Sequence, residues 1–149
     1  MKKRILILAL LAAGAATAAA HEGHDHATGV VRERMIAMET MGERLLAMSK
    51  RFRANKDMQQ VVDDAAAIEA LAAKITSLFP QGSTQAPTAA KPAVWQQWAD
   101  FEAKAAKLKA EAEKLAHMPT TDAVALRTQF RAVAFSCDAC HETYRVTKK

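Results

Sequence analysis

Four stretches of this chain place apolar side chains at alternating spacings of three and four residues, and this periodicity restricts the fold more than any other feature. The stretches cover roughly residues 29–54, 57–79, 92–115 and 120–144. Such spacing gathers the apolar side chains along one face of an α-helix. Patterns that would predict strands are almost absent. The sequence therefore predicts an all-α protein.

Each predicted helix has one apolar face and must bury it against the others. In the first helix this face comprises Val31, Met35, Met38, Leu45, Met48 and Phe52, and in the last it comprises Leu126, Phe130, Val133, Cys137, His141 and Tyr144. Short links join the first helix to the second and the third to the fourth, which makes each pair antiparallel neighbours. Residues 80–92, rich in Pro, Gly and small polar residues, form the one long loop. We predict an antiparallel up-down four-helix bundle.

The N-terminus has the order of regions of a secretory signal peptide. A basic start precedes a short apolar run, and small residues follow that end in three alanines. The apolar run is too short to span a bilayer. We predict a signal peptide at residues 1–20, a flexible His-rich tail at 21–28 and the four-helix domain at 29–149; an uncleaved N-terminal anchor is the alternative. Cleavage and export would place the protein in the periplasm, without stable membrane insertion.

The charge of the chain gives no reason to expect a nucleic-acid partner. Removal of residues 1–20 lowers the number of Lys and Arg from 21 to 18 while all 16 Asp and Glu remain, so the net charge falls from +5 to about +2. Clusters of Lys and Arg interleaved with aromatic residues are absent. The sequence also lacks a Ser-His-Asp set, paired carboxylates and a phosphate-binding loop, so we do not expect an enzyme.

The two cysteines of the chain stand in the motif Cys137-x-x-Cys140-His141. C-x-x-C-H is the attachment sequence of a c-type haem, with two thioether bonds and a histidine ligand to the iron. On a helix the three side chains project from one face, which here continues the apolar face of the bundle. A haem held there would therefore enter the bundle interior.

Two other interpretations of this motif fit the sequence less well. A redox-active dithiol of the thioredoxin type would follow a strand in an α/β unit, which this sequence lacks. A zinc site would need a second pair of Cys or His ligands at a fitting distance, and none is evident. Covalent attachment of haem c to Cys137 and Cys140 is the interpretation that the sequence favours.

Several motifs resemble the class II c-type cytochromes, the cytochrome c′ and cytochrome c-556 group. The segment from Cys137 to Arg145 is similar to the family pattern C-x-x-C-H-x-x-[FY]-R, residues 91–101 resemble the start of the family's third helix, and residues 78–80 resemble the end of its second. The resemblance implies a four-helix bundle with one covalent haem c. It also implies that His141 is the proximal ligand of the iron and that the other axial side faces the first helix.

The residue opposite His141 decides which function the resemblance implies. The family pattern of an Arg, a distal residue four positions later and a small residue one turn beyond fits Arg34, Met38 and Gly42, which makes Met38 the expected distal ligand. Glycine at position 42 would leave room for a porphyrin edge. Methionine sulfur as a sixth ligand stabilises ferrous iron and closes the site to gases.

Other residues remain candidates for the distal position. Met35 and Met41 lie on the same helix as Met38, and a methionine stripe at helical spacing is more often core filler than a set of ligands. An alignment anchored on Arg32 would place Ile36 at the distal position instead. An aliphatic residue there suits the five-coordinate cytochromes c′, whose open iron binds NO or CO.

We therefore expect a periplasmic electron-transport protein that carries single electrons through a haem bound by His141 and Met38. The alternative is a five-coordinate protein that binds NO or CO at an open site. Redox proteins are the expected partners, and the formation of a homodimer is left open. Arg145 is a candidate contact for a haem propionate, because a guanidinium suits a carboxylate.

Three histidines stand near the predicted mature N-terminus, at His21, His24 and His26. Together with neighbouring carboxylates they have the composition of a weak site for Cu(II), Ni(II) or Zn(II). A solvated tail without bound metal is the simpler interpretation.

Overall fold

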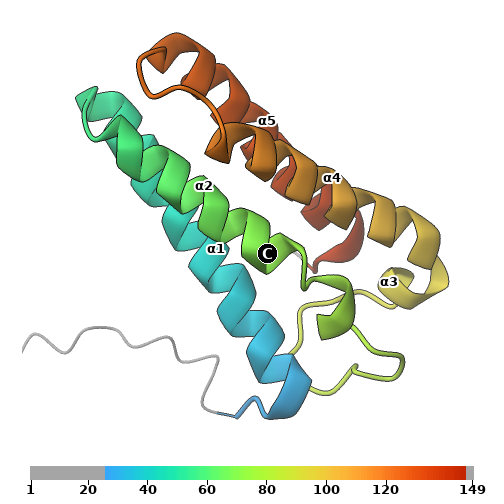
Figure 1. The fold of residues 1–149 in the computed structure, drawn as a ribbon. Helices are drawn as coiled ribbons and strands as arrows, with labels where there is room; N and C mark the ends of the chain where they lie inside the picture. Colours follow the sequence, from blue (N-terminus) through green and yellow to red (C-terminus); the bar gives the residue numbers. More distant parts are fainter. Residues whose placement is uncertain (1–25, 147–149) are drawn as a thin grey trace, which may run out of the picture.

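The computed structural model describes residues 26–146, so the predicted signal peptide, His21 and His24 lie outside the described residues. The described elements are α1 (Gly29–Ala54), α2 (Met58–Ala72), the 3-10 helix η1 (Thr76–Leu78), α3 (Ala93–Gln96), α4 (Trp98–Ala116) and α5 (Ala123–Tyr144) (Figure 1). No helix among these is both long and apolar enough to span a membrane.

The four long helices form the predicted up-down bundle. In Figure 1 the turns between α1 and α2 and between α4 and α5 lie at one end, and the long crossover between α2 and α3 lies at the other. Packing is most extensive between α2 and α4, followed by α4 with α5 and α1 with α2, whereas α1 and α5 touch little. The prediction of an all-α four-helix bundle is confirmed.

α1 and α5 meet mainly near the end of the bundle that carries the two short turns. There the ring of Phe52 lies 5.2 Å from that of Phe130, and Arg127 donates a 2.7 Å hydrogen bond to the carbonyl oxygen of Phe52. Toward the crossover loop the core gives way to a cavity, so the apolar face of α1 has two parts. Met48 and Phe52 are buried in the core, and Met38 and Leu45 line the cavity.

The second and third predicted helices are shorter than expected. α2 ends at Ala72, and a turn and η1 replace its expected last two turns. The third helix is interrupted at Gln97, whose ψ of 45° is not helical, so α3 and α4 are separate helices. The indole of Trp95 donates hydrogen bonds to the carbonyl oxygens of Phe79 and Pro80 at 3.0 and 3.1 Å. These bonds join α3 to the end of η1, a tertiary contact that local periodicity does not encode.

The fourth helix begins at Ala123, three residues after the predicted start, and its N-cap is Asp122. The carboxylate of Asp122 accepts a 2.9 Å hydrogen bond from the backbone N–H of Ala125. A side chain in this role satisfies a backbone donor that the first turn leaves unpaired. The first helix begins and ends as predicted, and the left-handed Asn55 (φ 48°) terminates it, a conformation that asparagine tolerates well.

A buried carboxylate fastens α1 to α2. Asp64 on α2 accepts hydrogen bonds from Arg44, at 2.6 Å, and from Arg51, both on α1. The side chain of Asp64 is only 5% exposed, whereas those of the arginines are 39% and 24% exposed. If the cationic donors are removed, the buried carboxylate is left with an uncompensated charge, which destabilises the fold.

Replacing Asp64 with asparagine is expected to lower the free energy of unfolding of the holoprotein by about 2–4 kcal/mol, because two charge-assisted hydrogen bonds are lost at a buried position. Denaturant titration measures the change. Asp63→Asn is the matched control, because the Asp63 side chain is exposed and accepts a hydrogen bond from Gln59 of the same helix. Equal effects of the two substitutions would show that the Asp64 cluster contributes nothing specific.

Candidate functional site

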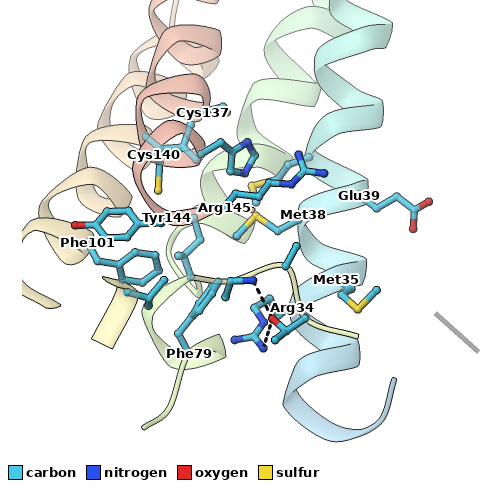
Figure 2. Close-up of a pocket in the computed structure, with 18 of the residues that line it drawn as sticks. Arg34, Met35, Met38, Glu39, Phe79, Phe101, Cys137, Cys140, Tyr144 and Arg145 are labelled. Atoms are coloured by element: carbon cyan, nitrogen blue, oxygen red, sulfur yellow. Dashed lines mark hydrogen bonds between the residues drawn. The ribbon is translucent and has the colours of Figure 1, made fainter. Parts of the chain in front are cut away.

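A cavity of about 360 Å³ opens between α1 and α5, with α4 and the crossover loop completing its walls. Figure 2 shows the side chains that surround it. Ile75, Phe79, Val94, Phe101 and Leu108 make much of the lining apolar. A mostly apolar cavity with a few convergent polar groups is typical of a cofactor site.

Cys137, Cys140 and His141 lie together on the α5 wall of this cavity. All three belong to α5 and all three line the cavity. Their spacing of three and four residues turns them to one side of the helix, as the sequence predicts. The cysteines form no disulfide. The motif therefore presents two thiols and an imidazole to the same apolar space.

The two thiols are not activated nucleophiles in this environment. Burial raises the pKa of Cys137 to about 11, with a further contribution from the Asp138 carboxylate. Burial also raises the pKa of Cys140. Redox-active dithiols instead depend on a lowered thiol pKa. The α5 environment thus argues against the dithiol interpretation.

His141 is set up to present a neutral imidazole. Burial, and then the positive charge of Arg145, lower its pKa from the ordinary value. A neutral ring nitrogen is the form that binds a metal. Within residues 26–146 no three Cys, His, Asp or Glu side chains are grouped so as to hold a metal ion, so the structure offers no zinc site around His141.

The opposite wall of the cavity comes from α1. Met35, Met38, Met41 and Leu45 all line it. In Figure 2, Met38 lies between α1 and the helix that carries the cysteines, and Met35 lies further toward the start of α1. Met41 is 4% exposed and belongs to the core as well as to the cavity wall. Three methionines of α1 thus line the cavity, and Met38 is the middle one along the helix.

Two further positions on α1 bear on the choice of distal residue. Ile36 is 43% exposed and does not line the cavity, because two residues along a helix correspond to a rotation of about 200° away from Met38. Gly42 is exposed, and a Cβ atom there would have no other atom within 4 Å. Gly42 thus lies on exposed surface and does not line the cavity, and the alignment that selects Ile36 likewise picks a residue outside the cavity.

Arg34 is the most deeply buried charged residue of the site, at 2% exposed. Its guanidinium lies 4.4 Å from the centre of the Phe79 ring and donates hydrogen bonds to the Ser83 carbonyl oxygen at 2.9 Å and to Thr88 Oγ1 at 3.0 Å. Longer bonds reach the Leu78 carbonyl and the Ser83 hydroxyl. Its Nε has no hydrogen-bond partner, and burial lowers its pKa. Arg34 therefore anchors the crossover loop and retains one unused donor.

Arg145 follows α5 and lines the same cavity. The backbone around it pairs with the end of the crossover loop, because Lys91 N–H bonds to the Tyr144 carbonyl and Val146 N–H to that of Ala89, both at 2.8 Å. The structure thus brings Arg145 and Arg34 to one cavity from opposite ends of the chain.

An aromatic cluster closes the cavity on the α4 side. The ring of Phe101 lies 4.8 Å from that of Phe79 and 5.3 Å from that of Tyr144. The Tyr144 hydroxyl donates a 2.6 Å hydrogen bond to the Asp100 carboxylate. Burial, and then this carboxylate, raise the pKa of Tyr144 to about 12, so the hydroxyl remains a donor. The cluster holds the end of α5 against α4.

The sequence identified the α5 motif and the α1 methionines but missed several parts of the site. Pro87 to Ala90 of the crossover loop form a cavity wall, and Asp100 positions Tyr144. Nothing in the sequence indicated that Arg34 is buried and bonded to the crossover loop, because Arg34 served there only to align Met38 with the family pattern. The proline-rich loop after Phe79 was the one available signal, since long ordered loops are often functional.

Comparisons with known proteins agree on one family. A sequence profile described as cytochrome c′ matches residues 29–145. The chain is 34% identical to cytochrome c-556 of Agrobacterium fabrum, over 85% of this chain and 87% of that protein. It is 32% identical to cytochrome c′ of Rhodopseudomonas palustris, over 99% of both. A solved cytochrome c′ described as having a ligand-controlled dimer dissociation superposes with a TM-score of 0.74 at 27% identity, covering 79% of this chain and 95% of the other.

Proposed function

The chain belongs to the cytochrome c′ family of c-type cytochromes, which carry covalently attached haem c, and we propose that it is a periplasmic electron carrier with an iron bound by His141 and Met38. The observation that carries the proposal is the position of Met38 across the cavity from the C-x-x-C-H helix. No catalytic group beyond the haem site is needed for this role. The predicted signal peptide supports the periplasmic location.

The residues of the cavity fit a haem c. Two adjacent thiols on the α5 wall suit thioether attachment, the imidazole beside them suits the iron, and the surrounding walls are apolar. The unpaired Nε of Arg34 and the side chain of Arg145 supply cationic donors of the kind that carboxylates such as propionates require. When bound, the haem iron takes up and releases one electron.

The role of the protein in this proposal is to fix ligands and exclude water. α5 orients His141, and the buried environment keeps its imidazole neutral. α1 supplies the Met38 thioether, a soft ligand that favours ferrous iron and raises the reduction potential. Phe79, Phe101 and the crossover loop line the cavity and would shield part of a bound haem from solvent. Screening of this kind also shifts the potential, because charge on the iron is less well solvated.

Visible spectra of the holoprotein test the proposal. A low-spin spectrum in both oxidation states, with a sulfur-to-iron charge-transfer band and no change on adding CO, is the expected result. A high-spin spectrum with ready CO binding would instead support the second candidate, a five-coordinate protein that binds NO or CO. The observation in favour of that candidate is the likeness to the cytochromes c′, which the family profile over residues 29–145 and the relative from Rhodopseudomonas palustris both show.

Redox proteins are the partners that electron transport requires. A homodimer is a second proposed assembly, because Ile36 and Leu46 leave apolar surface of α1 43% and 53% exposed. Weak metal binding by His21, His24 and His26 stays a proposal as well; of these three, only His26 lies in the described part of the chain, where it is exposed.

Replacing both Cys137 and Cys140 with serine is expected to abolish covalent haem attachment, because serine forms no thioether. The measurement is haem-dependent staining of the protein after denaturing electrophoresis, which detects only covalently held haem. Ser136→Ala is the control on the same helix, since Ser136 bonds to the Ala132 carbonyl and does not line the cavity. Haem that stays with the double variant after denaturation would contradict the assignment.

A further inference from the structure

The last turn of α5 carries His141, and its orientation decides where the imidazole points. Tyr144 follows His141 by three residues and Cys140 by four, so it projects from the same face of the helix. Tyr144 is 3% exposed, and its carbonyl oxygen accepts a 2.8 Å hydrogen bond from the Lys91 backbone N–H. A long, rigid side chain that is held at its far end prevents this turn from rotating.

The far end of Tyr144 is held by α4. Its hydroxyl donates a 2.6 Å hydrogen bond to the Asp100 carboxylate, with the Gln97 carbonyl oxygen as a longer alternative at 3.4 Å. The ring of Phe101 packs edge-on against that of Tyr144, with the ring centres 5.3 Å apart (Figure 2). A hydrogen bond to an ionised acceptor is stronger than one between neutral groups. The Asp100 carboxylate is therefore the principal partner of the hydroxyl.

The charge of Asp100 is largely compensated. Its side chain is 54% exposed and pairs at 3.7 Å with Lys104, one turn along α4. Both groups lie close to Cys140: burial raises the pKa of the thiol, Lys104 lowers it and Asp100 raises it. An exposed carboxylate with a cationic partner has little net influence, because solvent and partner screen its charge. What Asp100 contributes to the site is therefore the hydrogen bond with Tyr144 and not its charge.

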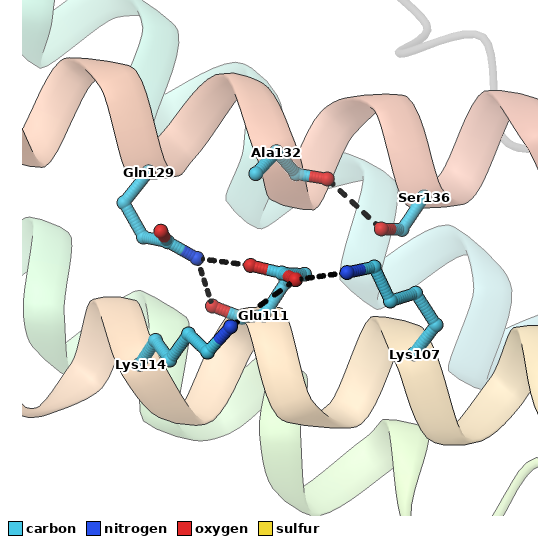
Figure 3. Close-up of polar contacts among 6 residues, drawn as sticks. All are labelled: Lys107, Glu111, Lys114, Gln129, Ala132 and Ser136. Atoms are coloured by element: carbon cyan, nitrogen blue, oxygen red, sulfur yellow. Dashed lines mark hydrogen bonds and ion pairs between the residues drawn. The ribbon is translucent and has the colours of Figure 1, made fainter.

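A second polar contact joins the same two helices away from the haem cavity. Figure 3 shows Gln129 of α5 donating to Glu111 of α4, at 2.6 Å to the carboxylate and 3.0 Å to the backbone carbonyl oxygen. Gln129 precedes His141 by twelve residues, or about 18 Å along a helix. Neither Gln129 nor Glu111 lines the cavity. This contact fastens α4 to α5 without touching the turn of His141, so it separates general helix packing from positioning of the ligand.

We propose that Asp100 is a positioning residue for the haem iron: by accepting the hydrogen bond of Tyr144, it fixes the turn of α5 that presents His141. The inference rests on the proposed binding of iron by His141. Groups around an axial ligand set its orientation and its strength as a donor. A turn that is free to rotate presents the imidazole less well. Ferric iron loses more from a weaker donor than ferrous iron does, so the reduction potential is expected to rise.

The test is the reduction potential of the holoprotein. Tyr144→Phe removes the donor and Asp100→Ala the acceptor, and each is expected to raise the equilibrium constant for one-electron reduction roughly three- to tenfold, or by about 30–60 mV. Asp100→Asn keeps an acceptor oxygen without the charge, and its change is expected to stay below about twofold. The double variant Tyr144→Phe/Asp100→Ala is expected to shift the potential no more than the larger single change, because both residues act through one bond.

Gln129→Leu is the matched control, because it breaks the contact of Figure 3 between the same helices. It is expected to lower the denaturation midpoint and to leave the potential unchanged. An equal shift of potential in Gln129→Leu would assign the effect to helix packing. Equal shifts in Asp100→Asn and Asp100→Ala would assign it to charge, and unchanged potentials in all variants would show that Asp100 has no part in it. Each of these results would overturn the proposal.

Electron paramagnetic resonance provides a second measurement, because the g-values of low-spin ferric haem depend on the orientation of the axial ligands. They are expected to shift in Tyr144→Phe and Asp100→Ala and to stay near the parent values in Asp100→Asn; unchanged g-values in the first two would contradict the inference. A high-spin holoprotein would refute ligation by Met38 alone, and the iron–histidine stretching frequency of the ferrous protein would then give the same comparison. A His141→Ala variant with the parent spectrum would overturn the premise and the inference together.

Discussion

Replacing Met38 with alanine is expected to convert a low-spin holoprotein into a high-spin one that binds CO, and to lower its reduction potential by about 100–300 mV. The thioether of Met38 reaches the cavity from α1, across from the helix that carries His141. Alanine at this position supplies no ligand and leaves the distal side open. The ferric state then becomes more stable relative to the ferrous state, because the soft sulfur that stabilises the reduced iron is absent.

Met35→Ala and Met41→Ala are the matched controls, since both residues line the same cavity from the same helix. Met41→Ala is expected to destabilise the protein, because Met41 is 4% exposed in the core, and to leave the low-spin spectrum unchanged. The measurements are visible spectra with and without CO and a spectroelectrochemical titration. If Met35→Ala or Met41→Ala became high-spin and Met38→Ala stayed low-spin, the methionine replaced in that control would be the ligand.

Replacing Arg34 with leucine is expected to lower the free energy of unfolding of the holoprotein by about 3–5 kcal/mol. The guanidinium is the main connection between α1 and the crossover loop, through Ser83 and Thr88. Leucine fills part of the volume but leaves the buried carbonyl of Ser83 without this donor. We also expect faster hydrogen exchange at the amide of Thr88, since the loop loses its anchor.

Arg32→Leu provides the control for this substitution, because Arg32 is exposed and stands one half-turn away on the same helix. Its effect on stability is expected to stay within about 0.5 kcal/mol. Denaturant titration of both holoproteins gives the comparison. If Arg34→Leu were as stable as Arg32→Leu, the loop would have to be held by its backbone bonds to residues 144–146 alone, and the importance of Arg34 would be disproved.

The cavity shows which parts of the site follow from local sequence and which do not. Cys137, Cys140 and His141 come together because one helical turn separates them, so their arrangement could be predicted. Met38 and Leu45 follow from the same helical spacing on α1. Arg34 is different: a charged residue on a helix is normally exposed, and only the fold of residues 78–88 around its guanidinium makes burial favourable.

The errors in the predicted helices have a similar cause. The stripe from residue 57 to 79 continues in the correct spacing, yet α2 stops at Ala72 because the chain must turn to carry Phe79 under Trp95. The stripe from residue 92 to 115 likewise continues through Gln97, where the helix is broken. Periodicity predicts which side chains are buried. It does not predict that the helix is continuous, because the same side chains can be buried when the helix is interrupted.

Local sequence determined the all-α class, the antiparallel pairing of helices across short links, and the presentation of two thiols and an imidazole on one helix face. These properties depend on residue spacing within a helix and on the length of the connection between helices, and both can be read directly from the sequence. Tertiary structure alone decided that α1 and α5 separate to leave a cavity, and that Arg34 is buried beside it and holds the crossover loop. Those outcomes depend on contacts between residues more than forty positions apart, such as Arg34 with Ser83, which no local pattern specifies.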